Sequence, residues 1–110
     1  MKLPNGDQAI VEDGKLRNYV LNPMHPVGRH HAFLFQKLLG IHIANLEILR
    51  KALLTAAVSE SVSRDTATVF GHKYEMSFQL CGPVGSKIIR AVWMIDEAGD
   101  RPRLITCFVE

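Results

Sequence analysis

Three histidines and an arginine lie within one short segment, His25–His31. Histidine can take up and return a proton near neutral pH, and arginine can stabilise an anionic transition state. A phosphate group is one anion that such a segment would suit at the start of a helix. We therefore take His25, Arg29 and His30 as candidate catalytic residues for acid–base chemistry.

The same histidines raise a metal-binding alternative, which the spacing does not favour. His-x4-His-His is not a standard ligand spacing, and adjacent residues on a helix point about 100° apart. The nearest carboxylates in sequence, Asp13 and Glu47, are distant. The sequence thus predicts no metal and no other cofactor. A structural alternative stays open, in which one histidine binds local backbone groups and His31 is solvated.

Three further candidates come from the C-terminal half: Arg90, Arg103 and Thr106. Arg90 interrupts the apolar run SKIIRAVWMI. An arginine in such a strand must find a carboxylate or open into a cleft. A salt bridge with Glu75 across the hairpin and a role in a cleft are both compatible with this pattern. Thr106 has good β propensity, so a structural role is its alternative.

The local sequence positions the histidine segment at the beginning of a helix. Pro23 and Pro26 prevent helix formation over Pro23–Val27. After Gly28 the pattern predicts a helix over Arg29–Leu39, ended by Gly40 as a left-handed residue. Cationic side chains at the positive end of a helix dipole are unfavourable unless an anion is nearby. That mismatch is the main functional signal in the sequence.

The remaining elements follow from periodicity. A turn signal at PNGD predicts a short hairpin or an edge strand at residues 9–11, and apolar spacing predicts helices over residues 13–21 and 43–58. Residues 59–68 are polar and read as an exposed connection. Strands are predicted at 69–80, 86–95 and 103–109, the second with the apolar content typical of a central strand covered by helices. The prediction is an α+β fold: three N-terminal helices, after a short hairpin, packed on a C-terminal antiparallel β-meander of three to four strands.

Composition limits the class of protein. The chain has 110 residues, so one domain over residues 1–110 is expected, and its net charge of +2 is too mild to indicate a nucleic-acid binder by itself. Two cysteines without a metal-type spacing do not make a secreted disulfide scaffold. No signal peptide or membrane-spanning run is visible. The sequence predicts a cytoplasmic protein without a membrane partner.

Four stretches resemble a family of small bacterial domains of unknown function: MKLPNGDQAIV, KLRNYVLNPMHPVGRHHAFLFQKLLGI, YEMSFQLCGPVGSKIIRAVWMI and PRLITCFV. The patterns N-P-x-H-P-x-G-x-H and P-R-L-x-T are the most specific parts. Related domains look like the C-terminal parts of polymorphic and phage-derived bacterial toxins. Such sequences commonly have lysine where this chain has His31.

The order of elements is also similar to the superfamily of metal-independent ribonucleases that includes barnase, the RelE toxins and tRNA-cleaving colicins. This resemblance implies an endoribonuclease toxin of a toxin–antitoxin-like pair, with RNA as substrate, a histidine activating a ribose 2′-hydroxyl and arginines stabilising the transition state. A small cognate antitoxin-like protein would be its partner. The alternative is a non-catalytic protein-interaction module encoded beside a small partner protein, with the histidines incidental.

Overall fold

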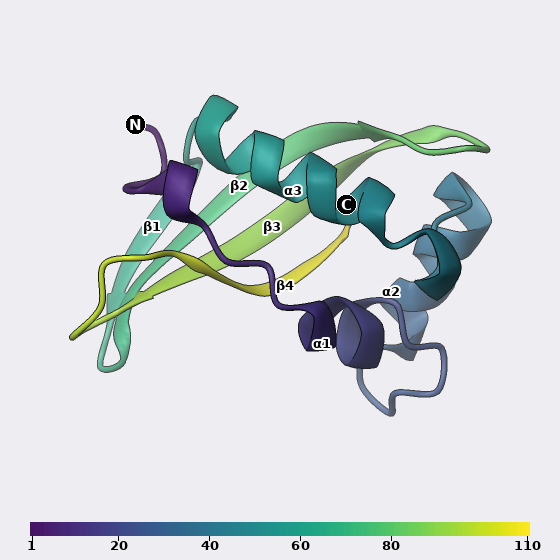
Figure 1. Ribbon diagram of the computed structural model, residues 1–110, viewed down its shortest axis with the longest axis horizontal. Helices are drawn as coiled ribbons and strands as arrows, with labels where there is room; N and C mark the ends of the chain where they lie inside the picture. The colour runs from purple at the N-terminus through teal and green to yellow at the C-terminus, as the bar shows by residue number, and fades with distance from the viewer.

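The computed structural model describes residues 1–110 and confirms the α+β class, with helices first and the sheet last (Figure 1). The helical segments are α1 (Asp13–Lys15, continued by a π-helical turn over Leu16–Val20), α2 (Arg29–Leu34, continued by another over Phe35–Leu39) and α3 (Glu47–Ser59). Short 3-10 turns occupy Gly6–Gln8 and Ile43–Asn45. The strands are β1 (Arg64–Thr68), β2 (Gly71–Cys81), β3 (Ser86–Asp96) and β4 (Arg103–Val109).

The four strands form one antiparallel sheet in the order β1-β2-β3-β4, a simple meander. Figure 1 shows α3 lying across the sheet, while α1 and α2 lie beside β4. A β-bulge falls between Val92 and Trp93, so Val92 faces Thr106 and Trp93 faces Leu104. The extra residue keeps Thr106 and Leu104 on opposite faces of the sheet.

The two faces of the sheet differ in burial. Met76, Ile89 and Trp93 point toward the helices and are fully buried. The alternate positions of β2 and β3 stay accessible to solvent. Helices therefore cover β3 on one side only, in contrast to the covering expected from its apolar sequence. We call the other side the open face, defined by Glu75, Ser77, Arg90, Val92, Thr106 and Phe108.

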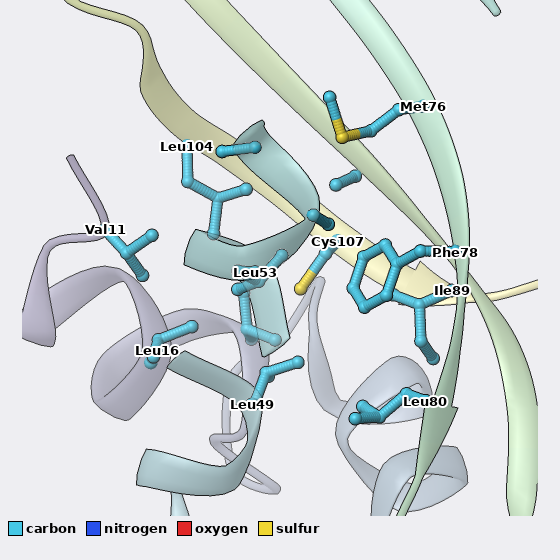
Figure 2. Packing of buried hydrophobic residues seen from close by; sticks show 14 of the residues in the cluster. Val11, Leu16, Leu49, Leu53, Met76, Phe78, Leu80, Ile89, Leu104 and Cys107 are labelled. Carbon is cyan, nitrogen blue, oxygen red and sulfur yellow. The ribbon is translucent and has the colours of Figure 1, made fainter. Parts of the chain in front are cut away.

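The core lies between α3 and the inner face of the sheet. Figure 2 shows Leu49 and Leu53 of α3 directed toward side chains of the strands, among them Phe78 and Cys107. Burial raises the pKa of the Cys107 thiol, because the interior does not solvate a thiolate. Cys107 is therefore an inert core residue, whereas Cys81 is exposed.

Two local predictions need correction. The hairpin expected near the N-terminus does not form, because Lys2 bridges to Ser61 and Ile10 bridges to Arg103 instead of to each other. Of the alternative, an edge strand at residues 9–11, the structure has one isolated parallel bridge, from Ile10 to Arg103 beside β4. Residues 59–68 are not only a connection, since their second half forms β1 against β2. β1 is polar and lies at the edge of the sheet, so apolar periodicity could not reveal it.

Gly40 ends the α2 segment in the left-handed conformation predicted for it, with φ 71°. We expect Gly40→Ala to lower the free energy of unfolding by about 1 kcal/mol, since a Cβ is unfavourable at positive φ. The added carbon would also lie 3.2 Å from Val84. Urea denaturation measures the effect. Gly14→Ala is the matched control, because Gly14 lies within α1 at ordinary φ and should gain stability. Equal effects of both changes would contradict this account.

Candidate active site

His25 makes local contacts in the turn that leads into α2. Its Nδ1 accepts hydrogen bonds from the backbone N–H groups of Val27 and Gly28, both at 3.0 Å. Its ring also packs edge-on against Tyr19, with ring centroids 4.8 Å apart. An accepting Nδ1 carries no proton, so in this arrangement only Nε2 remains for other contacts. The structure thus gives His25 the backbone-binding role that the sequence left open for one histidine.

Arg29 and His30 begin α2 with exposed side chains. Neither side chain makes a hydrogen bond or an ion pair within the chain, although the two rings of His30 and His31 lie 5.9 Å apart. Both residues are free to meet a ligand. Their catalytic roles stay predictions.

His31 occupies a different environment from the solvated one expected of it. It is half-buried, and its ring lies 5.3 Å from the ring of Phe108 on β4. Its Nδ1 is buried without a hydrogen-bond partner. A buried polar atom without a hydrogen-bond partner lowers the stability of the fold, so histidine is an unfavourable residue here if its role is purely structural.

Phe108 connects His31 with two of the predicted site residues. It stands opposite Arg90 in the β3–β4 pairing, and its side chain belongs to the open face. Thr106 is the next residue of β4 on that face and stands opposite Val92. The structure therefore places His31, and not the histidines predicted from the sequence, beside Phe108, whose neighbours on the open face include Arg90 and Thr106.

Arg90 is the centre of a polar network on the open face. Its Nε donates to Glu110 at 2.9 Å, and its Nη1 approaches Glu75 at 3.3 Å and Ser63 at 3.4 Å. The salt bridge with Glu75 that the sequence suggested is confirmed. Nη2 makes no hydrogen bond or ion pair within the chain, and the side chain is 29% exposed. The two carboxylates orient the guanidinium while leaving part of it available to an anion.

Arg103 lies on the same side of the sheet but apart from this network. It stands opposite Met94 and forms an ion pair with Asp96 at 3.1 Å. The hydrogen bond from Arg103 to Asp96 raises the pKa of the guanidinium. Phe108 is five residues further along β4, about 17 Å at the rise of an extended strand. Arg103 is thus not brought together with Arg90 and His31.

Glu110 provides a pH test of the network. The hydrogen bond from the Ser77 hydroxyl, at 2.6 Å, and the Arg90 charge lower the pKa of the Glu110 carboxyl. The unfolded chain then binds more protons in acid, so this contribution to stability is present above the ordinary carboxyl pKa and is lost as pH falls. We expect the stability difference between wild type and Glu110→Gln to shrink between neutral pH and acid, measured as urea midpoints. A constant difference would contradict the network.

The candidate residues neither form a metal site nor line a hollow in the surface. No three histidine, cysteine or acidic side chains are grouped closely enough to hold a metal ion. One hollow of about 250 Å³ lies between α3 and β2, and another of about 300 Å³ lies beside α2. None of the predicted site residues lines either hollow. No helix has the length and apolar character needed to cross a membrane.

Sequence reasoning missed His31, although a signal was available. His31, Leu34 and Leu38 recur at the i, i+3, i+7 spacing of one helix face, and all three are partly buried. That spacing places His31 on the packed side of α2. His30 is one residue earlier and belongs to the exposed side.

The family described as "Domain of unknown function (DUF6883)" matches residues 2–110. No curated protein matches the chain significantly. Among solved structures, one chain of a structure described as "Contact-dependent growth inhibition toxin - immunity protein complex from Klebsiella pneumoniae 342" is similar in fold, with a TM-score of 0.73 and 16% sequence identity. The similarity covers 92% of this chain and 99% of that chain. At this identity the likeness concerns the fold alone.

Proposed function

The chain belongs to the DUF6883 family of domains of unknown function, and from that premise we propose that it is a toxin-type domain that cleaves RNA on the open face of its sheet. The observation that carries the proposal is the placement of His31 and Arg90 on either side of Phe108. A proton-transferring group and an anion-stabilising group beside one solvent-accessible surface are what phosphodiester cleavage requires. The fold shared with a chain of the toxin–immunity protein complex is consistent with a toxin-type role.

In the proposed reaction, the His31 imidazole takes the proton of a ribose 2′-hydroxyl. The 2′-oxygen attacks the adjacent phosphorus, and Arg90 stabilises the charge that develops on the phosphoryl oxygens through its unengaged Nη2. The bond from phosphorus to the 5′-oxygen breaks, and that oxygen takes a proton from water at the open face. The hydroxide that remains takes the proton from His31, which restores the imidazole. The products are a 2′,3′-cyclic phosphate end and a 5′-hydroxyl end. In this proposal the Thr106 hydroxyl donates a hydrogen bond to a substrate oxygen, a role supported by its place on the open face.

The sequence assigned roles in this site to Arg29, His30 and Arg103 as well. Arg29 and His30 are unengaged on the same helix as His31 and are assigned no step in this reaction. Arg103, in its own ion pair, and His25, in its turn, are assigned no step. A small protein that neutralises the domain is the partner that this function entails.

A second candidate function has one specific observation in its favour. Arg90 and Arg103 both form ion pairs within the chain, as expected of a non-catalytic interaction module. Expression in a bacterium distinguishes the two. The toxin proposal predicts growth arrest with fragmented RNA for wild type and normal growth for His31→Phe at equal protein level. Normal growth of both, or arrest by both without RNA fragments, would favour the interaction module.

A further inference from the structure

The surface of α2 and the loop before it has an unusual charge pattern. The sequence from Asn22 to Leu46 contains no aspartate or glutamate. Within it, Arg29 and Lys37 have exposed side chains, and neither forms an ion pair in the chain. Elsewhere four of the six arginines are paired with carboxylates, namely Arg17, Arg50, Arg90 and Arg103, whereas Arg64 and Arg101 form no ion pair. This part of the molecule therefore presents uncompensated positive charge.

The same surface exposes large apolar side chains. Met24 and Val27 of the loop are 84% and 70% exposed, and Phe33 of α2 is 54% exposed. Lys37 lies over the Phe33 ring, with Nζ 5.6 Å from the centroid. Phe33 thus presents an apolar edge next to a positive charge. Three large exposed apolar groups in so short a segment are typical of an interaction surface.

A hollow of about 300 Å³ adjoins these residues. Its wall includes Pro23 of the loop, Ala32 and Gln36 of α2, and Ile43 of the following 3-10 turn. Ala32 and Gln36 lie on the helix next to Arg29 and Phe33, at the i, i+3, i+4, i+7 spacing of one face. The hollow is large enough for one apolar side chain of another molecule, with Arg29 and Phe33 at its border.

We propose that this α2 surface, comprising Met24, Val27, Arg29, Phe33 and Lys37 with the adjoining hollow, docks a protein that presents an apolar side chain surrounded by carboxylates. Apolar groups and a hollow give affinity at the centre of a protein interface, and uncompensated cations select an acidic rim. RNA fits less well, because two permanent cations neutralise few phosphates and the apolar groups would gain little.

The docking surface itself does not depend on the proposed toxin role. Only the purpose of the partner rests on that proposed function: the partner would inhibit the domain. His31 lies on the same helix, with its ring against Phe108 of the open face. A protein seated on the α2 surface would therefore border the proposed site. It could block RNA from that site without contacting Arg90.

A displayed library of short random peptides, selected on the full chain, tests the docking surface. We expect enriched peptides to combine a large apolar residue with flanking aspartate or glutamate. Lys37→Glu should weaken their binding about tenfold or more, as removal of a complementary charge does, and Phe33→Ser should do the same. Lys51→Glu, an exposed cation on α3, is the matched control and should leave binding unchanged.

The inference would be overturned if no peptides were enriched, or if the enriched peptides lacked acidic residues. It would also be overturned if Lys37→Glu and Phe33→Ser left peptide binding intact. A fourth contradicting result is a Lys37→Glu variant that loses binding to single-stranded RNA but keeps binding to peptides. The last result would make the surface a nucleic-acid interface. RNA cleavage is assayed on the same preparations. A chain that binds peptides as expected and cleaves no RNA would remove the proposed function and leave the docking surface standing.

Discussion

Replacement of His31 by phenylalanine is expected to lower the rate of RNA cleavage by about 10²- to 10⁴-fold, the range typical of a lost acid–base group. Phenylalanine keeps an aromatic ring against Phe108, so packing at this contact is preserved. It also removes the buried Nδ1 that has no partner, so the variant should be at least as stable as wild type. Cleavage rates and urea midpoints of the two proteins together measure the effect.

His31→Lys provides the informative comparison, because it replaces the imidazole by another side chain that can carry a proton. A lysine can exchange a proton and hold a positive charge beside the transition state, although its ordinary pKa is less suited to a base near neutrality. We expect the lysine variant to retain more cleavage than the phenylalanine variant. Equal loss in both, or wild-type rates in His31→Phe, would remove the imidazole from the reaction.

Arg90→Met is expected to lower the cleavage rate by about 10²- to 10³-fold, as the loss of one preorganised donor to a developing anion does. The change also removes the partner of two partly buried carboxylates, Glu75 and Glu110, so a loss of stability is expected beside the loss of rate, and urea midpoints show that the variant is folded. Methionine preserves the apolar stem of the side chain beside Phe108. Rates of cleavage at saturating RNA measure the loss directly.

Arg17→Met is the matched control for Arg90→Met. Arg17 also forms an ion pair, with Asp13 at 2.9 Å, and its side chain is 48% exposed on the helical side of the molecule. Its replacement removes one positive charge far from the open face and should leave cleavage unchanged. If both substitutions reduced cleavage equally, overall charge rather than the site would be responsible.

Much of the fold could be predicted because local signals and tertiary structure agree. Two prolines and Gly28 indicated where α2 begins. Gly40 indicated where this helical segment ends, and it has the left-handed conformation expected of it. The strands 86–96 and 103–109 followed from apolar runs between strong turns. The predicted membership of a family of unknown function was also confirmed.

The candidate site was predicted only in part, for physical reasons. The Arg90–Glu75 pair follows from strand pairing and was foreseen. The spacing of His31, Leu34 and Leu38 indicates the packed side of α2, but local sequence does not show that this side meets β4. His25 was a candidate because of its residue type, but its Nδ1 accepts hydrogen bonds from the backbone of its own turn. The second carboxylate, Glu110, reaches Arg90 because the chain continues past β4, which no motif indicates.

The most direct test of the central claim is cleavage of single-stranded RNA by the purified chain in the presence of a chelator, with analysis of the product ends. The account predicts fragments that carry 2′,3′-cyclic phosphate and 5′-hydroxyl ends from wild type, and no fragments above background from Arg90→Met or His31→Phe. Intact RNA with wild type, or the same fragments from all three proteins, would contradict RNA cleavage on the open face of the sheet.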